Sequence, residues 1–189
     1  MGLSIHYSGT IRSMSLVYQL IDETVDICES MNWNYCIVNE AGDERLNGIV
    51  FSPANCEPVF LTLLPNGRMC SPINLMNKDF YILNGFDRDL IYTTSTKTQF
   101  AGPDTHIALL KLLRYLKEKY FGNFELDDEG YYWGTNDEKI LFQRFDEYNQ
   151  AISAVKEVLT EMHHIPGENA ESLANRIEDV LKKMFGKKD

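Results

Sequence analysis

The segment from Lys97 to Trp133 constrains the fold most, because it predicts a strand, a helix and a second strand in direct succession. Residues 90–100 are rich in Thr, Ile and Tyr, which favour strands. Gly102-Pro103-Asp104 then starts a helix, because Pro suits a first helical turn, and Gly122-Asn123 ends it. The buried stripe of this helix consists of Leu109, Leu112, Leu113, Leu116 and Tyr120.

The flanking segments add more strands and one more helix. Leu3, Ile5 and Tyr7 alternate with polar residues and predict a first strand, and apolar residues at helical spacing predict a helix over 14–31. Pro65-Asn66-Gly67 predicts a hairpin turn that returns the chain through residues 68–70. Further strands are predicted at residues 35–38, 48–51, 59–64, 80–83 and 124–128, the last continuing through 131–133 after a bulge or turn at Gly130.

The C-terminal third predicts two helices in succession. Thr135 and Glu138 have the form of a capping box, and the helix that follows carries apolar residues at 141, 145, 148, 152, 155, 159 and 162. The loop 163–167 contains Pro-Gly and precedes a last helix over 169–185. This pattern predicts an antiparallel helical hairpin. Its apolar stripes either close on each other and on the domain, or form a seam with a partner or a second copy in a homodimer.

The order of these elements predicts the fold class. A strand and a helix, several strands, a helix, a strand and two helices indicate an α+β domain with a mainly antiparallel sheet and helices packed on one face. We expect this domain to span residues 1–162, and residues 163–189 to form a loop and a helix that packs on the domain or on a partner.

Charge and composition exclude several classes of partner. The chain has 189 residues, of which 44% are hydrophobic, enough for one globular domain with a buried core. Its formal charge is −10, and because residues 181–189 carry a net charge of +3, the remainder carries −13. Such a surface repels nucleic-acid phosphates and anionic lipid, so we expect neither nucleic acid nor a membrane as a partner.

The N-terminus and the cysteines favour a cytoplasmic location. The first ten residues alternate as a strand does and contain no apolar run of the kind found in a signal peptide. Cys28, Cys36, Cys56 and Cys70 form no C-x-x-C pair. We interpret them as reduced thiols, mostly buried, and expect no disulfide and no metal site.

Strand alternation predicts a polar face on the sheet. If Leu3, Ile5, Tyr7, Phe100, Phe124 and Leu126 point into the core, the opposite face carries Ser4, His6, Ser8, Lys97, Gln99, Glu125 and Asp127. An imidazole, an ammonium and two carboxylates on one face could bind a polar ligand or transfer protons. The alternative is an ordinary solvated face, which antiparallel sheets usually have.

His106 is a second candidate. It lies in the first turn of its helix at the angle of Leu109 and Leu113, so we expect its ring to face inward. A buried neutral histidine, hydrogen-bonded to backbone or to a carboxylate, is one interpretation; a catalytic base paired with Asp128 or Glu129 is the other. Near these carboxylates, Tyr132 and Trp133 offer flat amphipathic surface that suits either binding or a core.

Known catalytic and cofactor motifs do not occur in the sequence. It contains no nucleotide-binding glycine pattern, zinc-ligand spacing, nucleophile elbow or kinase signature. The acidic run Asp127-Asp128-Glu129 lacks the further oxygen ligands of a hard-cation loop. We therefore predict no cofactor and no metal.

Three short segments resemble a family of uncharacterised bacterial proteins. They are His6-Tyr7-Ser8-Gly9, the run Lys97-Thr98-Gln99-Phe100 leading to His106, and the run from Asp128 to Trp133. The resemblance covers about residues 1–160 and leaves the last helix unmatched. It implies a bacterial cytosolic origin and brings no established activity.

Together these features favour a non-enzymatic cytosolic domain that binds a small polar ligand or a protein partner. The alternative is an acid/base enzyme of the hydrolase type that uses His6 or His106 with Asp128 or Glu129. The position of the two histidines relative to a concave pocket discriminates between them. The ligand-binding candidates are His6, Lys97, Gln99, His106, Asp128, Glu129, Tyr132 and Trp133.

Overall fold

The structure is a computed structural model that describes residues 2–39, 45–85, 88–161 and 169–185. It divides into two compact units, Met1–Phe145 and Asp146–Asp189, and each is described by itself. The first unit contains two three-stranded antiparallel sheets with helices, so the predicted α+β class is confirmed. The predicted domain boundary at residue 162 falls outside the described residues and stays a prediction.

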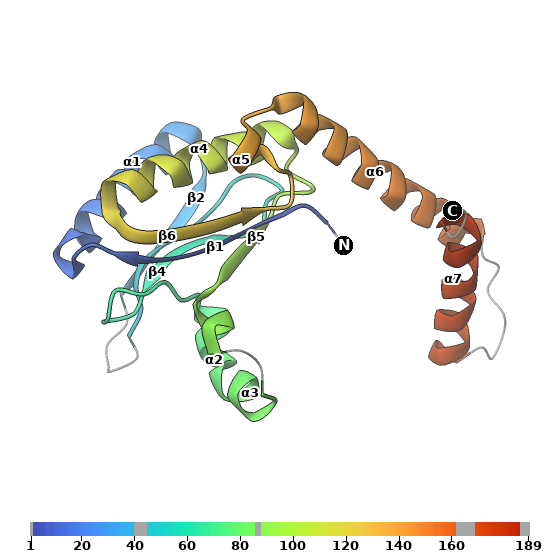
Figure 1. Cartoon of the computed structure of the whole chain (residues 1–189), viewed down its shortest axis with the longest axis horizontal. Helices are drawn as coiled ribbons and strands as arrows, with labels where there is room; N and C mark the ends of the chain where they lie inside the picture. The colour runs from blue at the N-terminus through green and yellow to red at the C-terminus, as the bar shows by residue number, and fades with distance from the viewer. Residues whose placement is uncertain (1, 40–44, 86–87, 162–168, 186–189) are drawn as a thin grey trace. The chain divides into compact units, whose positions relative to one another are not determined.

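The first sheet has the N-terminal strand at its centre (Figure 1). Strand β1 (Ser4–Ile11) pairs antiparallel with β5 (Thr94–Lys97) on one side and with β6 (Phe121–Asp128) on the other. His6 lies opposite Ser95 and Asp127 in this register. Because cross-strand partners share a face, these three side chains point the same way, as predicted from the alternation of β1.

The second sheet has the order β2 (Asn34–Asn39), β3 (Asn47–Ser52) and β4 (Val59–Leu63). The predicted hairpin after β4 is confirmed: Gly67 has φ +81° and its N–H donates to the Leu64 carbonyl, a backbone conformation that favours glycine. Bridges of residues 68 and 69 to β1 and β4 join the two sheets. The buried Tyr7 hydroxyl adds to this junction, because it accepts a hydrogen bond from the Phe60 N–H at 2.9 Å.

Helices α1 (Val17–Met31) and α4 (Pro103–Tyr120) cover the same face of the sheets (Figure 1). A short 3₁₀ turn, η1 (Met14–Leu16), precedes α1, and Ser13 caps it by accepting from the Ser15 N–H. Glu23 of α1 accepts hydrogen bonds from Lys119 and from Tyr120 of α4, which holds the two helices side by side.

On the other side of the sheets lie α2 (Pro72–Met76), α3 (Lys78–Leu83) and the 3₁₀ helix η2 (Arg88–Tyr92) (Figure 1). The prediction of a strand over 80–83 is wrong, and the predicted strand 90–100 is shortened to β5. Ser71 caps α2 by accepting from the Asn74 N–H, and the Asn74 amide binds the Thr93 carbonyl at 2.7 Å. These side-chain bonds fix the start of α2 and tie it to residues 90–93, where apolar content alone suggested a strand.

In the described residues after β6, the elements of secondary structure are all helices. Helix α5 (Tyr132–Thr135) replaces the predicted strand continuation over 131–133, which is wrong. Helix α6 (Glu138–Glu161) follows, and Asp137 rather than Thr135 caps it, since its carboxylate accepts from the Lys139 N–H. Helix α7 (Ala170–Phe185) confirms the last predicted helix, whereas the antiparallel hairpin stays a prediction, because its loop lies outside the described residues. Among the described helices, none is long and apolar enough to cross a membrane.

Candidate functional site

The predicted site residues divide between the core and the open face of the β5–β1–β6 sheet. Gln99, His106, Asp128 and Tyr132 are buried, whereas His6, Lys97, Glu129 and Trp133 are half-buried. Asp128 is the last residue of β6 and Glu129 begins the turn that follows it. Asp128 is buried in the core, whereas Glu129 is half-buried on the open face. Asp128 lies near His106, and Glu129 lies near His6.

The core group is centred on His106, whose predicted inward orientation is confirmed. Its Nδ1 lies 2.6 Å from the Thr98 hydroxyl, and its Nε2 lies 2.8 Å from Asp128 Oδ1. The Thr98 hydroxyl also lies 3.2 Å from the Leu3 carbonyl. Thus the start of α4, the end of β5 and the end of β6 are joined through one imidazole.

Asp128 is the most highly coordinated member of this group. Burial by itself raises the pKa of its carboxyl, but hydrogen bonds from His106 and from the Trp133 and Gly130 N–H groups outweigh that effect and lower the pKa. Those N–H groups lie 2.8 and 2.7 Å from the carboxylate oxygens. The carboxylate therefore caps the turn into α5, where Tyr131 adopts φ +63°.

The hydroxyl–imidazole–carboxylate series resembles a catalytic relay in its groups but not in its setting. Thr98 and His106 are 0% exposed and Asp128 is 5% exposed, so the three groups are closed off from solvent. The edge of the Phe145 ring closes over the imidazole at a centroid distance of 5.7 Å. At this depth the three groups have the geometry of a structural clamp that joins α4, β5 and β6.

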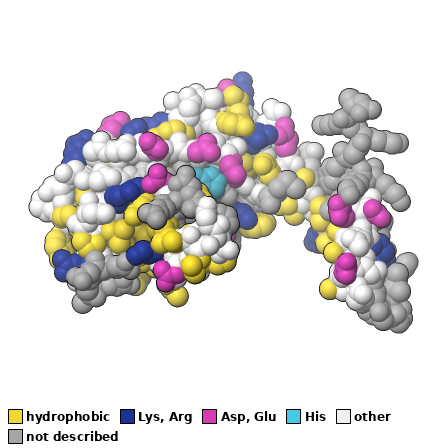
Figure 2. Space-filling model, turned by 60° about the horizontal axis from the view of Figure 1, so that its bottom comes forward, with side chains coloured by type: hydrophobic (Ala, Val, Ile, Leu, Met, Phe, Trp, Pro, Cys, Tyr) yellow, Lys and Arg dark blue, Asp and Glu magenta, His cyan; other side chains and the backbone are white. Residues whose placement is uncertain are grey.

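The open face of the sheet carries the second histidine. His6 Nε2 lies 3.7 Å from Glu129 Oε1, and the two side chains are 38% and 37% exposed. Glu129 also accepts a hydrogen bond from the Ser4 N–H at 2.7 Å, which fixes the carboxylate at the end of β1. Acidic side chains gather around a histidine on this face in Figure 2. Those of β6 are Glu125 and Asp127, both exposed.

Two residues lie elsewhere than predicted. Gln99 is buried, not on the open face, and its Oε1 accepts from the Leu3 N–H at 2.9 Å. Phe100 is 69% exposed, not in the core. The cause is the same for both: β5 ends at Lys97, and the chain then turns, with the Ala101 N–H donating to the Thr98 carbonyl. Strand alternation no longer applies beyond that point.

A cavity of about 400 Å³ opens beside this face, and its residues were missed by sequence reasoning. Ser95, the cross-strand partner of His6, is one of the lining residues, so the cavity adjoins the polar face. Part of the lining comes from the start of α2. The sequence signal for that helix start is Ser71-Pro72, a capping residue followed by proline. The lining residues are Glu57, Pro58, Phe60, Ser71, Ile73, Asn74 and Ser95.

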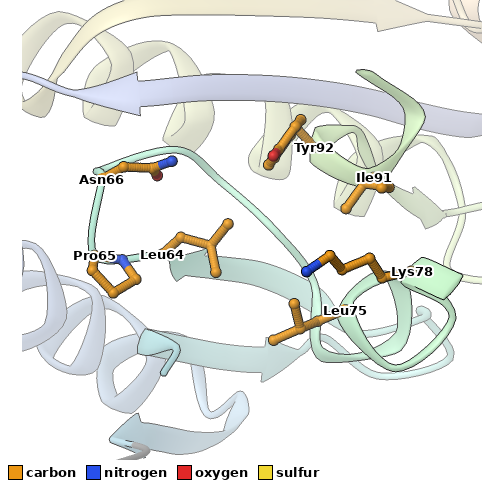
Figure 3. A pocket seen from close by; sticks show the side chains of 7 residues that line it. All are labelled: Leu64, Pro65, Asn66, Leu75, Lys78, Ile91 and Tyr92. Atoms are coloured by element: carbon orange, nitrogen blue, oxygen red, sulfur yellow. The ribbon is translucent and has the colours of Figure 1, made fainter. Parts of the chain in front are cut away.

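A second cavity, of about 270 Å³, lies between the β4 hairpin, η2 and the start of α3 (Figure 3). Its apolar lining residues include Leu64, Leu75 and Ile91, and the ammonium of Lys78 points toward the cavity. Within the described part of the chain, no group of three or more His, Cys, Asp or Glu side chains is arranged to hold a metal ion.

Comparisons of the chain with protein-family models, with curated proteins and with solved structures found no match. The assignment of function therefore depends on the geometry of the site.

Proposed function

We propose that the chain is a non-catalytic binding domain, and that the cavity beside the open face of the β5–β1–β6 sheet binds a small ligand with a cationic group and an apolar group. The observation that carries the proposal is the combined lining of this cavity. Glu57 supplies a carboxylate, while Phe60, Pro58 and Ile73 supply apolar surface. The volume of about 400 Å³ lies within the range of small-molecule sites.

The charge of the surrounding face supports a cationic ligand. Glu125 and Asp127 lie on this face and Glu129 lies beside His6. The basic groups predicted there from the sequence are the His6 imidazole and the Lys97 ammonium. Concentrated carboxylates attract a protonated amine and repel an anion. Ser95 and Asn74 add polar groups that can orient the ligand. The predicted cytoplasmic location, and the predicted lack of binding to nucleic acid, belong to the same proposal.

The burial of the better-formed histidine–carboxylate pair supports a non-catalytic role. His106 and Asp128 meet at hydrogen-bond distance, but beneath the surface of the domain rather than at a pocket mouth. The accessible pair, His6 and Glu129, is separated by more than a hydrogen bond.

Calorimetric titration with three probes that share a phenethyl group tests the proposal. We expect phenethylamine to bind more tightly than the neutral 2-phenylethanol and the anionic 3-phenylpropionate. Glu57→Gln should weaken amine binding by roughly tenfold, because it removes the charge and keeps the shape. Glu118→Gln, an exposed change on α4, is the matched control and should have no effect. Equal binding of the amine and the alcohol, or no binding of any probe, would contradict the proposal.

One observation favours the alternative, an acid/base hydrolase. His6 and Glu129 lie close together on an accessible face, where substrate binding can shorten their separation. Hydrolysis of p-nitrophenyl acetate by the parent chain and by His6→Ala distinguishes the two functions. Turnover that is lost in His6→Ala and retained in His106→Gln would support the enzyme.

A further inference from the structure

Strand β2 exposes an unpaired edge. Its six residues pair antiparallel with β3, and no other strand in the described ranges pairs with the opposite edge. Five of the six residues are exposed, and Val38 is half-buried. Such an edge presents free backbone N–H and C=O groups in register for another strand.

The composition of this edge is unusual for the chain. The strand reads Asn-Tyr-Cys-Ile-Val-Asn and contains no charge and no proline, the features that usually keep edge strands from pairing. The whole chain carries a formal charge of −10, so most surfaces would meet their own copy with like charges. The uncharged edge of β2 can pair with the same edge of a second copy without that repulsion.

The neighbouring side of α1 adds exposed apolar side chains to this surface. The Tyr35 hydroxyl donates to Glu29 of α1, which places Tyr35 and, two residues on, Ile37 on the face that α1 covers. Tyr18 and Val25 lie eleven and four residues before Glu29, on the same side of α1. Tyr18 is 68% exposed and Ile37 is 52% exposed. Exposed apolar side chains of α1 and β2 therefore lie beside the strand edge, together with the carboxylates of Asp22 and Glu29.

We propose that β2 pairs antiparallel with β2 of a second copy of this chain, about a two-fold axis perpendicular to the sheet and centred on Cys36. This symmetry keeps both α1 helices on one side and matches residues that share a face. Centring on Cys36 places Tyr35 opposite Ile37 of the second copy, an aromatic and β-branched pair. The proposal goes beyond ligand binding and uses a surface different from the C-terminal helices considered above.

Sedimentation of the full chain over a wide concentration range tests the interface. We expect a reversible dimer, and we expect Ile37→Lys to weaken it by roughly tenfold or more, because an ammonium is then buried against Tyr35 in each half. The matched control is Ile152→Lys on α6, a site that is 38% exposed. A monomeric parent chain, or a dimer lost in Ile152→Lys and kept in Ile37→Lys, would overturn the proposal.

Mild oxidation with copper phenanthroline tests the register. Cα atoms of directly opposed residues lie about 4.5–5.5 Å apart, within disulfide range. Two Cys36 thiols should then lose two protons and two electrons to the oxidant and form one S–S bond between copies. We expect a covalent dimer in the parent and in Cys56→Ser, and none in Cys36→Ser. A dimer sensitive to Ile37→Lys that does not cross-link through Cys36 would overturn the register.

Discussion

The two faces of the β5–β1–β6 sheet carry the same pair of chemical groups in opposite settings. On the covered face, His106 and Asp128 meet at 2.8 Å, with side chains 0% and 1% exposed. On the open face, His6 and Glu129 lie 3.7 Å apart, with more than a third of each side chain exposed. Asp128 and Glu129 are neighbours in sequence, so one step along the chain separates a structural clamp from an accessible polar site.

Burial determines what each pair contributes. A buried carboxylate is costly unless donors satisfy it, and Asp128 has three, from His106, Gly130 and Trp133. An exposed pair is hydrated in both the folded and the unfolded chain, so its net contribution is small. The buried pair should therefore control stability, whereas the exposed pair remains available for ligands.

The largest expected effect comes from His106→Ala. The change removes the partner of Thr98 and leaves a buried carboxylate with one fewer donor, so we expect a loss of about 3 kcal/mol in the free energy of unfolding. His6→Ala is the matched change on the open face and should cost at most about 0.5 kcal/mol. Urea denaturation of the two variants measures both values.

His106→Gln sharpens this test, since a side-chain amide can replace part of the hydrogen bonding. We expect it to be more stable than His106→Ala. Equal stability of the parent and His106→Ala, together with loss of ligand affinity or turnover, would move His106 from the core to the functional site.

The second effect comes from Gly130→Ala, which tests how tightly the buried pair is packed. A methyl group there would lie 3.0 Å from His106 Nε2, 3.0 Å from Asp128 Oδ1 and 2.5 Å from a Leu141 methyl group. Overpacking of this kind costs about 1–3 kcal/mol. Gly134→Ala is the control, because no atom lies within 4 Å of the added methyl group. Thermal denaturation should separate the two alanine variants clearly, and similar melting temperatures would show that the pair tolerates rearrangement.

The sequence predicted the buried position of His106 and its two candidate carboxylate partners, but not its contact with Thr98. The angle of His106 relative to Leu109 and Leu113 was enough to place the ring inside, and Asp128 and Glu129 were the carboxylates within reach. Thr98 was not singled out, because its contact depends on β5 ending at Lys97. That end is set by a turn bond between Ala101 and Thr98. A local hydrogen bond of this kind leaves no periodic signal.

The antiparallel sheet and the long helices were predictable for a different reason. Each buries one stripe or one face along many residues, and the period of that burial is visible in the sequence. The short helices α2 and α5 are held by single side chains, Asn74 and Asp128. The sequence did not predict the cavity beside Ser95 either, because α2, which was not predicted, supplies part of its lining.

The third effect is a pH dependence that arises from Asp128 on the buried face. The pKa of Asp128 is lowered in the folded chain, so the unfolded chain binds its proton more readily. The stability from this carboxylate is fully present above its unfolded pKa of about 3.9, and is lost as pH falls through the lower folded value. We expect the gap in unfolding free energy between the parent and Asp128→Asn to be constant near neutrality and to narrow in acid. A gap that stayed constant down to strong acid would mean that the carboxylate charge contributes nothing.

The smallest effect is expected from Glu129→Gln on the open face. The variant keeps an oxygen that can accept from the Ser4 N–H and removes the charge near His6. We expect a change of at most about 0.5 kcal/mol at low salt, because exposed ion pairs contribute little. It should vanish at about 1 M salt, where screening acts over roughly 3 Å. Denaturation at two ionic strengths measures it, with Glu125→Gln as the control, since that carboxylate is exposed on the same strand. A loss comparable to that of His106→Ala, and insensitive to salt, would make His6 and Glu129 a second structural clamp, and the open face would no longer be the place to expect a ligand.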